Sequence, residues 1–145
     1  MSTLTFEQAE DEIIAMFVEG WAATGDPTPL DVYYEDVPKE RLTDNAAFAS
    51  VQVNFRNGSQ RGFGGGEGGL RMFQRHGDFR CQIHTLAGKG LLESRRLAKV
   101  VVDSFEGKHS PGGVWFRSIN IVDIGRNGLF RIDDIAVFFE YDEVK

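Results

Sequence analysis

Residues 114–141 read VWFRSINIVDIGRNGLFRIDDIAVFFEY, and this stretch decides the fold. Near its middle, Asn127-Gly128 is the dipeptide that two-residue type I′ hairpin turns prefer, because both turn residues need a positive φ. A turn at this dipeptide pairs residues whose numbers sum to 255, which sets Phe116 opposite Phe139. The stretch therefore predicts a C-terminal β-hairpin.

The predicted hairpin has two apolar faces. Its register pairs Arg117 with Phe138 and Ile119 with Ala136, on the side opposite Phe116. Helices of the same domain can cover one face, whereas the other face needs a second sheet, a loop or a neighbouring subunit. We therefore predict a subunit interface on the second face, made by Trp115, Arg117, Ile119, Ile121 and Phe138.

Two amphipathic helices precede the hairpin. Residues 5–8, TFEQ, read as a capping box, in which two side chains and two backbone amides bond reciprocally. A helix over about residues 5–23 follows, with an apolar stripe at i, i+4 spacing made by Ala9, Ile13, Phe17 and Trp21. A second helix opens after Gly88 and Gly90 and ends before Gly107, and its apolar face holds Leu97, Ala98, Val101 and Phe105.

Alternating apolar residues predict strands over Asp31 to Glu35, over Phe48 to Phe55, and through Phe79 to Ile83, the last beginning as early as Met72. Residues 57–70, NGSQRGFGGGEGGL, are half glycine and lose too much backbone entropy to hold regular structure unaided, so we predict a flexible loop.

The order of elements predicts an α+β fold. A mostly antiparallel sheet is packed by two helices and carries the long Gly-rich loop and the C-terminal β-hairpin, in one domain over residues 1–145. The predicted core consists of Phe17, Trp21, Val53, Ile83, Val101, Phe105, Phe116 and Phe139.

The charge of the chain is unevenly distributed. The net charge of -6 argues against a general nucleic-acid binder. Residues 1–50 hold 2 basic and 11 acidic side chains, whereas residues 51–100 hold 9 basic and 3 acidic ones. Unlike surfaces on one subunit suit head-to-tail self-association, and a mixed solvated surface explains the pattern equally well. One cysteine, an acidic N-terminus and no apolar run of about 20 residues lead us to expect a soluble cytosolic protein without a membrane partner.

No set of residues in the sequence predicts catalysis. Gly64, Gly66 and Gly69 form a G-x-G-x-x-G that lacks the following helix of a dinucleotide site. On an extended strand His76 and His84 share one face and Cys81 takes the other, so they do not converge on a metal. We therefore expect no enzyme activity, no cofactor and no metal site.

Arginines surround the Gly-rich segment. The basic stretch comprises Arg56, Arg61, Arg71, Arg75 and Arg80, against Glu67 and Asp78. Such a stretch suits contact with an acidic partner surface, or with DNA passing through a pore, and it is also compatible with a solvated face.

Several segments resemble the phage tail-terminator-like family. They are TFEQAEDEIIAMFVEGWAATGDPTPLDVYYEDVP, the Gly-rich insertion, LAKVVVDSFEGKHSPGGVWFRSINIVDIGRNGLF and the ending FFEYDEV. The resemblance spans nearly the whole chain, and its specificity lies in the combination of these segments. The sequence departs from the family's pattern from Arg41 to Ala47 and in the length of the Gly-rich stretch.

The resemblance implies an α+β subunit of a homo-oligomeric, hexameric ring. This ring would sit on the finished tail tube, stop tube polymerisation and present a surface to the head-completion protein. The partners implied are other copies of the chain, the tail tube protein, the head-completion protein and, non-specifically, DNA passing through the ring. The protein would be found in the host cytoplasm during assembly and in the virion tail. Alternatives are another neck or head-completion subunit, or a small ligand-binding domain with a concave pocket.

Overall fold

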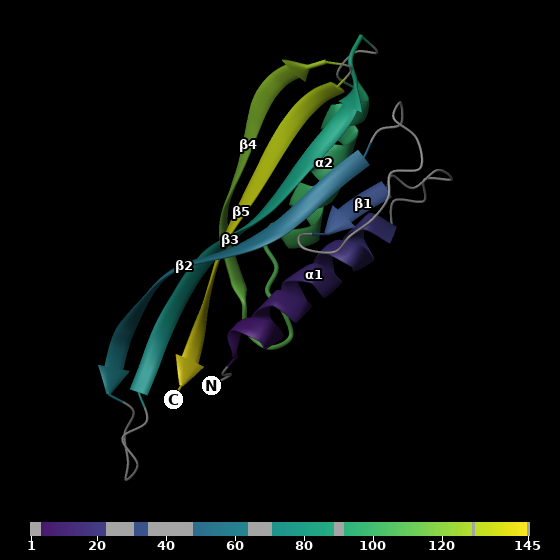
Figure 1. Cartoon of the computed structure of the whole chain (residues 1–145). Helices are drawn as coiled ribbons and strands as arrows, with labels where there is room; N and C mark the ends of the chain where they lie inside the picture. The colour runs from purple at the N-terminus through teal and green to yellow at the C-terminus, as the bar shows by residue number, and fades with distance from the viewer. Residues whose placement is uncertain are drawn as a thin grey trace.

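The structure is a computed structural model, and it describes residues 4–22, 31–34, 48–63, 71–88, 92–128 and 130–144. Along the chain these residues form α1 (Phe6–Ala22), β1 (Asp31–Tyr34), β2 (Phe48–Phe63), β3 (Arg71–Leu86), α2 (Leu92–Phe105), β4 (Trp115–Asn127) and β5 (Phe130–Val144). The strands form one sheet in the order β1-β2-β3-β5-β4, as Figure 1 shows. β1 runs parallel to β2, and every other neighbouring pair is antiparallel.

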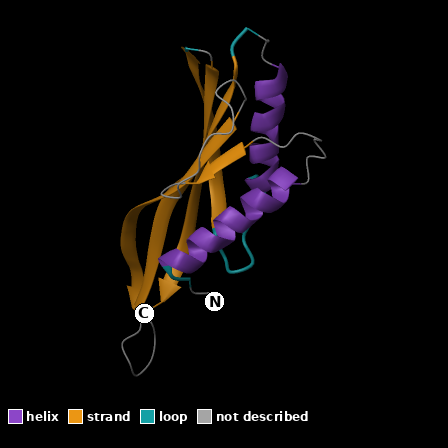
Figure 2. Cartoon of the chain, turned by 45° about the vertical axis from the view of Figure 1, so that its right-hand side comes forward, coloured by secondary structure: helices purple, strands orange, loops and turns teal. Residues whose placement is uncertain are grey.

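Both helices pack against the same face of the twisted sheet, which we call the helix face (Figure 2). We call the opposite side the outer face. The fold is thus α+β, with two helices on a mostly antiparallel sheet and a C-terminal hairpin, as the sequence predicts. Among the described residues, no helix is long and apolar enough to cross a membrane.

The capping box begins α1 as predicted. The Thr5 amide donates to Gln8 Oε1 at 3.1 Å, and the Gln8 amide donates to Thr5 Oγ1 at 3.3 Å. These two bonds satisfy amides that the first turn of a helix leaves without intrahelical partners. Ala9, Ile13 and Phe17 of the predicted apolar stripe are buried in the core.

A chain of aromatic contacts forms the centre of the core. The ring of Phe17 lies 5.3 Å from that of Phe79, Phe79 lies 5.0 Å from Phe105, and Phe105 lies 4.8 Å from Phe116. The chain links α1, β3, α2 and β4, so one cluster fixes both helices to the sheet. The predicted core is confirmed: six of its residues are buried, and Trp21 and Phe116 are partly buried against them.

The predicted loop over residues 57–70 is wrong in its first half. β2 continues to Phe63 and pairs with β3, for example Gly58 with Arg75 and Phe63 with Arg71. Two irregularities interrupt this pairing, after Phe55 and after Gln60. Ladder hydrogen bonds to β3 supply the stabilisation that a glycine-rich segment cannot provide alone. Residues 64–70 lie outside the described part of the chain, as do residues 41–47.

The predicted hairpin register is correct only at the start of β4. At the other end Asn127 pairs with Phe130 and belongs to β4, so the predicted turn at Asn127-Gly128 is wrong. Phe116 pairs with Phe139 as expected, but Ser118 pairs with Phe138, and Ile119 pairs with Val137 rather than with Ala136. A β-bulge at Arg117 adds one residue to β4, and a second irregularity lies between Asp123 and Gly125. One extra residue exchanges the two faces of everything that follows it.

The predicted placement of Ile119 and Ile121 is therefore wrong. Directly opposed residues of an antiparallel pair point to the same face, and Ile119 and Ile121 oppose Val137 and Ile135. Both partners are fully buried on the helix face. Consequently the two isoleucines share a face with Phe116, and Ile119 packs against the core.

Candidate interaction surface

The edge strand β4 carries most of the exposed apolar side chains of the sheet. It pairs with β5 along one side, and the only other bridge to it among the described residues joins His109 to Trp115. Four large apolar side chains on β4 are about half exposed: Trp115, Ile121, Val122 and Ile124. A sheet edge of this kind offers both unpaired backbone groups and apolar area to another chain.

Trp115 and Arg117, two residues of the predicted interface, lie together at the start of β4. Arg117 Nε donates to Glu140 Oε1 at 2.6 Å, and the guanidinium lies 5.8 Å from the centre of the Trp115 ring. The ring of His109 packs on Trp115 at 4.7 Å, and Glu140 also lies 3.8 Å from His76 Nδ1. Trp115 is thus held in place while half of its surface remains exposed.

Phe138, the third residue of the predicted interface, is half-buried on the outer face. It lies between Ser118 of β4 and Asp78 of β3 in the pairing of the sheet. Phe138 and Trp115 therefore remain on the predicted second face, whereas Ile119 does not. The sequence did not single out Val122, which opposes Asp134 and is 53% exposed. Its place on the outer face follows only once the bulge at Arg117 is known.

An ion network lies next to Phe138 on the outer face. The side chain of Asp78 is fully buried and accepts hydrogen bonds from Arg56 Nε at 2.6 Å and from Arg80 Nε at 2.7 Å. Arg80 also donates to Asp134 at 3.0 Å. Burial raises the pKa of Asp78, but hydrogen bonds from Arg80, Arg56 and Asn54 outweigh burial and lower that pKa below its ordinary value.

The arginines of the predicted basic stretch whose side chains the structure describes lie on different faces of the sheet. Arg56 is engaged with Asp78 on the outer face. Arg75 lies on the helix face, where it bonds Glu143 at 3.0 Å and its guanidinium lies 5.4 Å from the ring centre of Phe6. Arg61 and Arg71 belong to β2 and β3, and their side chains lie outside the described residues. Arg56 and Arg75 therefore form ion pairs within the subunit.

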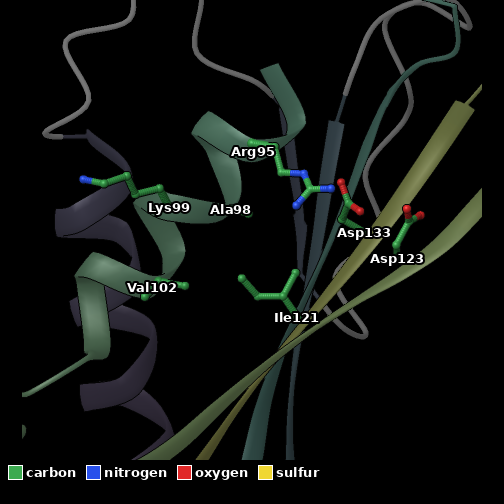
Figure 3. A pocket seen from close by; sticks show the side chains of 7 residues that line it. All are labelled: Arg95, Ala98, Lys99, Val102, Ile121, Asp123 and Asp133. Carbon is green, nitrogen blue, oxygen red and sulfur yellow. The ribbon is translucent and has the colours of Figure 1, made fainter. Parts of the chain in front are cut away.

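A cavity of about 370 Å³ opens between α2 and the β4–β5 end of the helix face (Figure 3). It is lined by Arg95, Ala98, Lys99, Val102, Ile121, Asp123 and Asp133. The guanidinium of Arg95 and the carboxylate of Asp133 point toward one another, above the apolar side chain of Ile121. Three buried polar atoms on neighbouring positions of β3 and β5 have no hydrogen-bond partner: Thr85 Oγ1, Arg131 Nε and Asp133 Oδ2.

The cysteine and histidines of β3 are separated as the strand alternation predicts. Cys81 is fully buried in the core, and burial, reinforced by the charge of Asp134, raises the pKa of its thiol. His84 stacks on Phe48 at 4.2 Å on the outer face. In the described part of the chain, no group of three or more His, Cys, Asp or Glu side chains is placed to hold a metal ion.

Comparison with known proteins gives a likeness in fold. No family model and no curated protein matches the chain. A solved structure that has no descriptive name matches with a TM-score of 0.63 and 17% sequence identity. The match covers 94% of this chain and 95% of that chain, so the whole arrangement of helices and sheet recurs there.

Proposed function

We propose that this chain is a structural subunit of the tail-terminator type. Copies of it close into a hexameric ring on a finished phage tail tube. The ring stops polymerisation of the tube protein and presents a surface to the head-completion protein, and DNA passes through it. The chain works in the host cytoplasm during assembly and then in the virion tail, without enzyme activity of its own.

The observation that carries the proposal is the exposed apolar edge of the sheet. A subunit of a ring needs two different surfaces that fit each other. Trp115 and Val122 are each about half exposed on a strand whose outer side has no strand partner among the described residues. Aromatic residues such as Trp115 often contribute most of the binding energy at the centre of a subunit contact. The sequence resemblance to tail terminators agrees with this arrangement.

The direct test is electron microscopy of tails assembled with and without the protein. We expect tails of uniform length with a ring at the upper end when the protein is present. Without it, the tube protein should form tubes of variable length that do not join heads. Tubes of unchanged length and unchanged head joining in its absence would refute the proposal.

A point variant tests the predicted outer-face contact. Phe138→Asp should leave the circular dichroism spectrum unchanged but abolish ring formation and tail capping, because a carboxylate would enter an apolar contact. Leu92→Asp, at a position 85% exposed on α2, is the matched control and should still cap tails.

Phe138→Asp could also unfold the protein or leave tail capping normal. Unfolding of Phe138→Asp would place Phe138 in the subunit's own core, and Trp115→Ala, a change at a half-exposed position, then tests the same face. Normal capping by Phe138→Asp and by Trp115→Ala would contradict the outer-face contact.

The cavity beside α2 supports a second candidate, a small ligand-binding domain. Its volume of about 370 Å³ lies within the usual range for ligand sites. Asp133 Oδ2 offers a buried acceptor, and Arg95 and Lys99 are the hydrogen-bond donors in the lining. A ligand would therefore need both a donor and an acceptor on an apolar body. A thermal-shift screen with such compounds tests this candidate, and Asp133→Asn should abolish any shift that arises at this site.

A further inference from the structure

The middle of β4 is a regular strand between two irregularities. From Ser118 to Asp123, each residue pairs in uninterrupted order with β5, from Phe138 to Asp133. The bulges at Arg117 and before Gly125 end this segment on both sides. In the described structure no strand pairs with its outer edge. Natural edge strands are usually protected by lysine, proline or a covering element, and residues 118–123, SINIVD, contain neither lysine nor proline.

Two neighbouring side chains of this segment are about half exposed. Ile121 is 51% exposed on the helix face, and Val122 is 53% exposed on the outer face. The apolar area therefore lies on both sides of the strand edge. A single helix or loop laid on one face would cover only half of it. An added strand covers both halves, because its side chains also alternate between the two faces.

The segment is complementary to itself when two copies run antiparallel about Asn120. This register sets Asn120 opposite Asn120 of the second copy, Ile119 opposite Ile121, and Ser118 opposite Val122. Isoleucine meets isoleucine on the helix face, and the two amides meet on the outer face, where they can bond each other. Shifting the centre to Ile121 would set Ile119 against Asp123, and a centre at Ile119 would set Ile121 against Arg117.

The charges at the ends of the segment favour the same direction. Arg117 stands at one end of the segment and Asp123 at the other. An antiparallel arrangement brings the basic end of each copy beside the acidic end of the other. A parallel arrangement would bring like charges together, which is unfavourable. Arg117 already pairs with Glu140 and Asp123 with Arg131 within the subunit. The charges therefore favour the antiparallel direction of the second strand but add little to the affinity between the two copies.

We propose that a second copy of this chain docks on β4 by antiparallel pairing of residues 118–122 about Asn120. The resulting two-fold dimer joins two five-stranded sheets into one ten-stranded sheet. A five-residue strand contact alone buries less than the roughly 800 Å² per partner of a standard interface. The dimer therefore dissociates with a constant of roughly 1–100 µM. It is a form of the free protein, and the inference does not depend on the proposed ring.

A single cysteine tests the register. Asn120→Cys places one thiol at the two-fold axis, where opposed Cβ atoms are close enough for a disulfide. Mild oxidation of the folded variant should give a covalent dimer on a non-reducing gel. Ser118→Cys and Val122→Cys each face a different residue and should remain largely monomeric, whereas the variant carrying both should cross-link. The native Cys81 stays in place, since it is fully buried.

Sedimentation equilibrium tests the association itself. The unmodified protein should pass from monomer to dimer as its concentration rises through the micromolar range. Ile121→Lys should remain monomeric, and Leu92→Lys, an equally large change at an exposed helix position, should dimerise normally.

Three results would overturn the inference: a purely monomeric protein at roughly 100 µM, equal cross-linking of all three single cysteines, or no cross-linking of Asn120→Cys while the protein dimerises. If Ile121→Lys does not fold, the cysteine variants decide alone. If one of these three results is found and tails still carry rings, the dimer contact is wrong and the proposed function is unaffected.

Discussion

At the scale of single residues, the fully buried carboxylate of Asp78 is the most consequential polar group in the protein. It lies on a face that neither described helix covers, and Arg56 and Arg80 enclose it. A buried charge is tolerated only when its hydrogen bonds are made. These arginines therefore bind a carboxylate of their own subunit, although their positions in the sequence also suit a surface that meets an acidic partner.

We predict that Asp78→Asn lowers the free energy of unfolding by about 1.5–3 kcal/mol at pH 7, because two charge-assisted bonds are weakened. The folded pKa of Asp78 is lowered, so its contribution is present above the ordinary value of 3.8 and is lost as the pH falls through the folded pKa. The difference between variant and parent should therefore shrink below about pH 4. Urea unfolding at pH 7 and pH 3 measures both effects. Asp103→Asn, which removes an exposed ion pair to Lys99, should change little at either pH.

The aromatic chain through the core gives a second prediction at this scale. Phe105 is fully buried and touches Phe79 and Phe116, so Phe105→Ala should cost roughly 3–5 kcal/mol. The melting temperature should fall plainly in a thermal scan. Leu92→Ala, on the exposed side of the same helix, serves as control and should stay within about 0.5 kcal/mol of the parent. An unchanged melting temperature for Phe105→Ala would show that its side chain does not fill the core.

At the scale of elements, β4 shows how far the sequence determines the fold. The two helices and the cap of α1 follow from periodicity and from capping residues. The pairing of Phe116 with Phe139 agrees with the prediction only because two irregularities in β4 offset the shift of the turn. The bulge at Arg117 does not follow from the sequence pattern, because both faces of the hairpin carry apolar residues and the alternation therefore fits either register. The predicted interface therefore included Ile119, which the bulge turns into the core. Likewise, the pairing of the glycine-rich part of β2 depends on β3, which lies later in the chain.

A pair of deletions tests the role of the bulge. Deleting Arg117 removes the extra residue but leaves Ser118 opposite Phe138, so the faces of Ile119 and Ile121 are retained and the protein should fold. Deleting Asn120 instead exchanges the faces of all residues on one side of the gap and should destabilise the protein strongly. Circular dichroism and urea unfolding compare the two. Equal stability of both deletions would contradict the assigned register.

At the scale of the whole molecule, the layering explains why one subunit offers so much surface for association. Two helices cover the helix face, and the aromatic chain joins them to the centre of the sheet. The apolar side chains that remain exposed on the sheet gather on β4, at one edge. Any chain that docks on this edge would thus meet a strand that β5 holds in register with the core.

The strand order also determines when the sheet can form during protein synthesis. β5 is the last strand in sequence, yet it lies between β3 and β4. While the ribosome is still making its 15 residues, β4 has no neighbour to pair with and β3 lacks one of its two. At roughly 5–20 residues per second this interval lasts about 1–3 s. During it the apolar residues of β4 are open to nascent chains on neighbouring ribosomes of the same message, so co-translational chaperones should matter more for this subunit than its small size suggests.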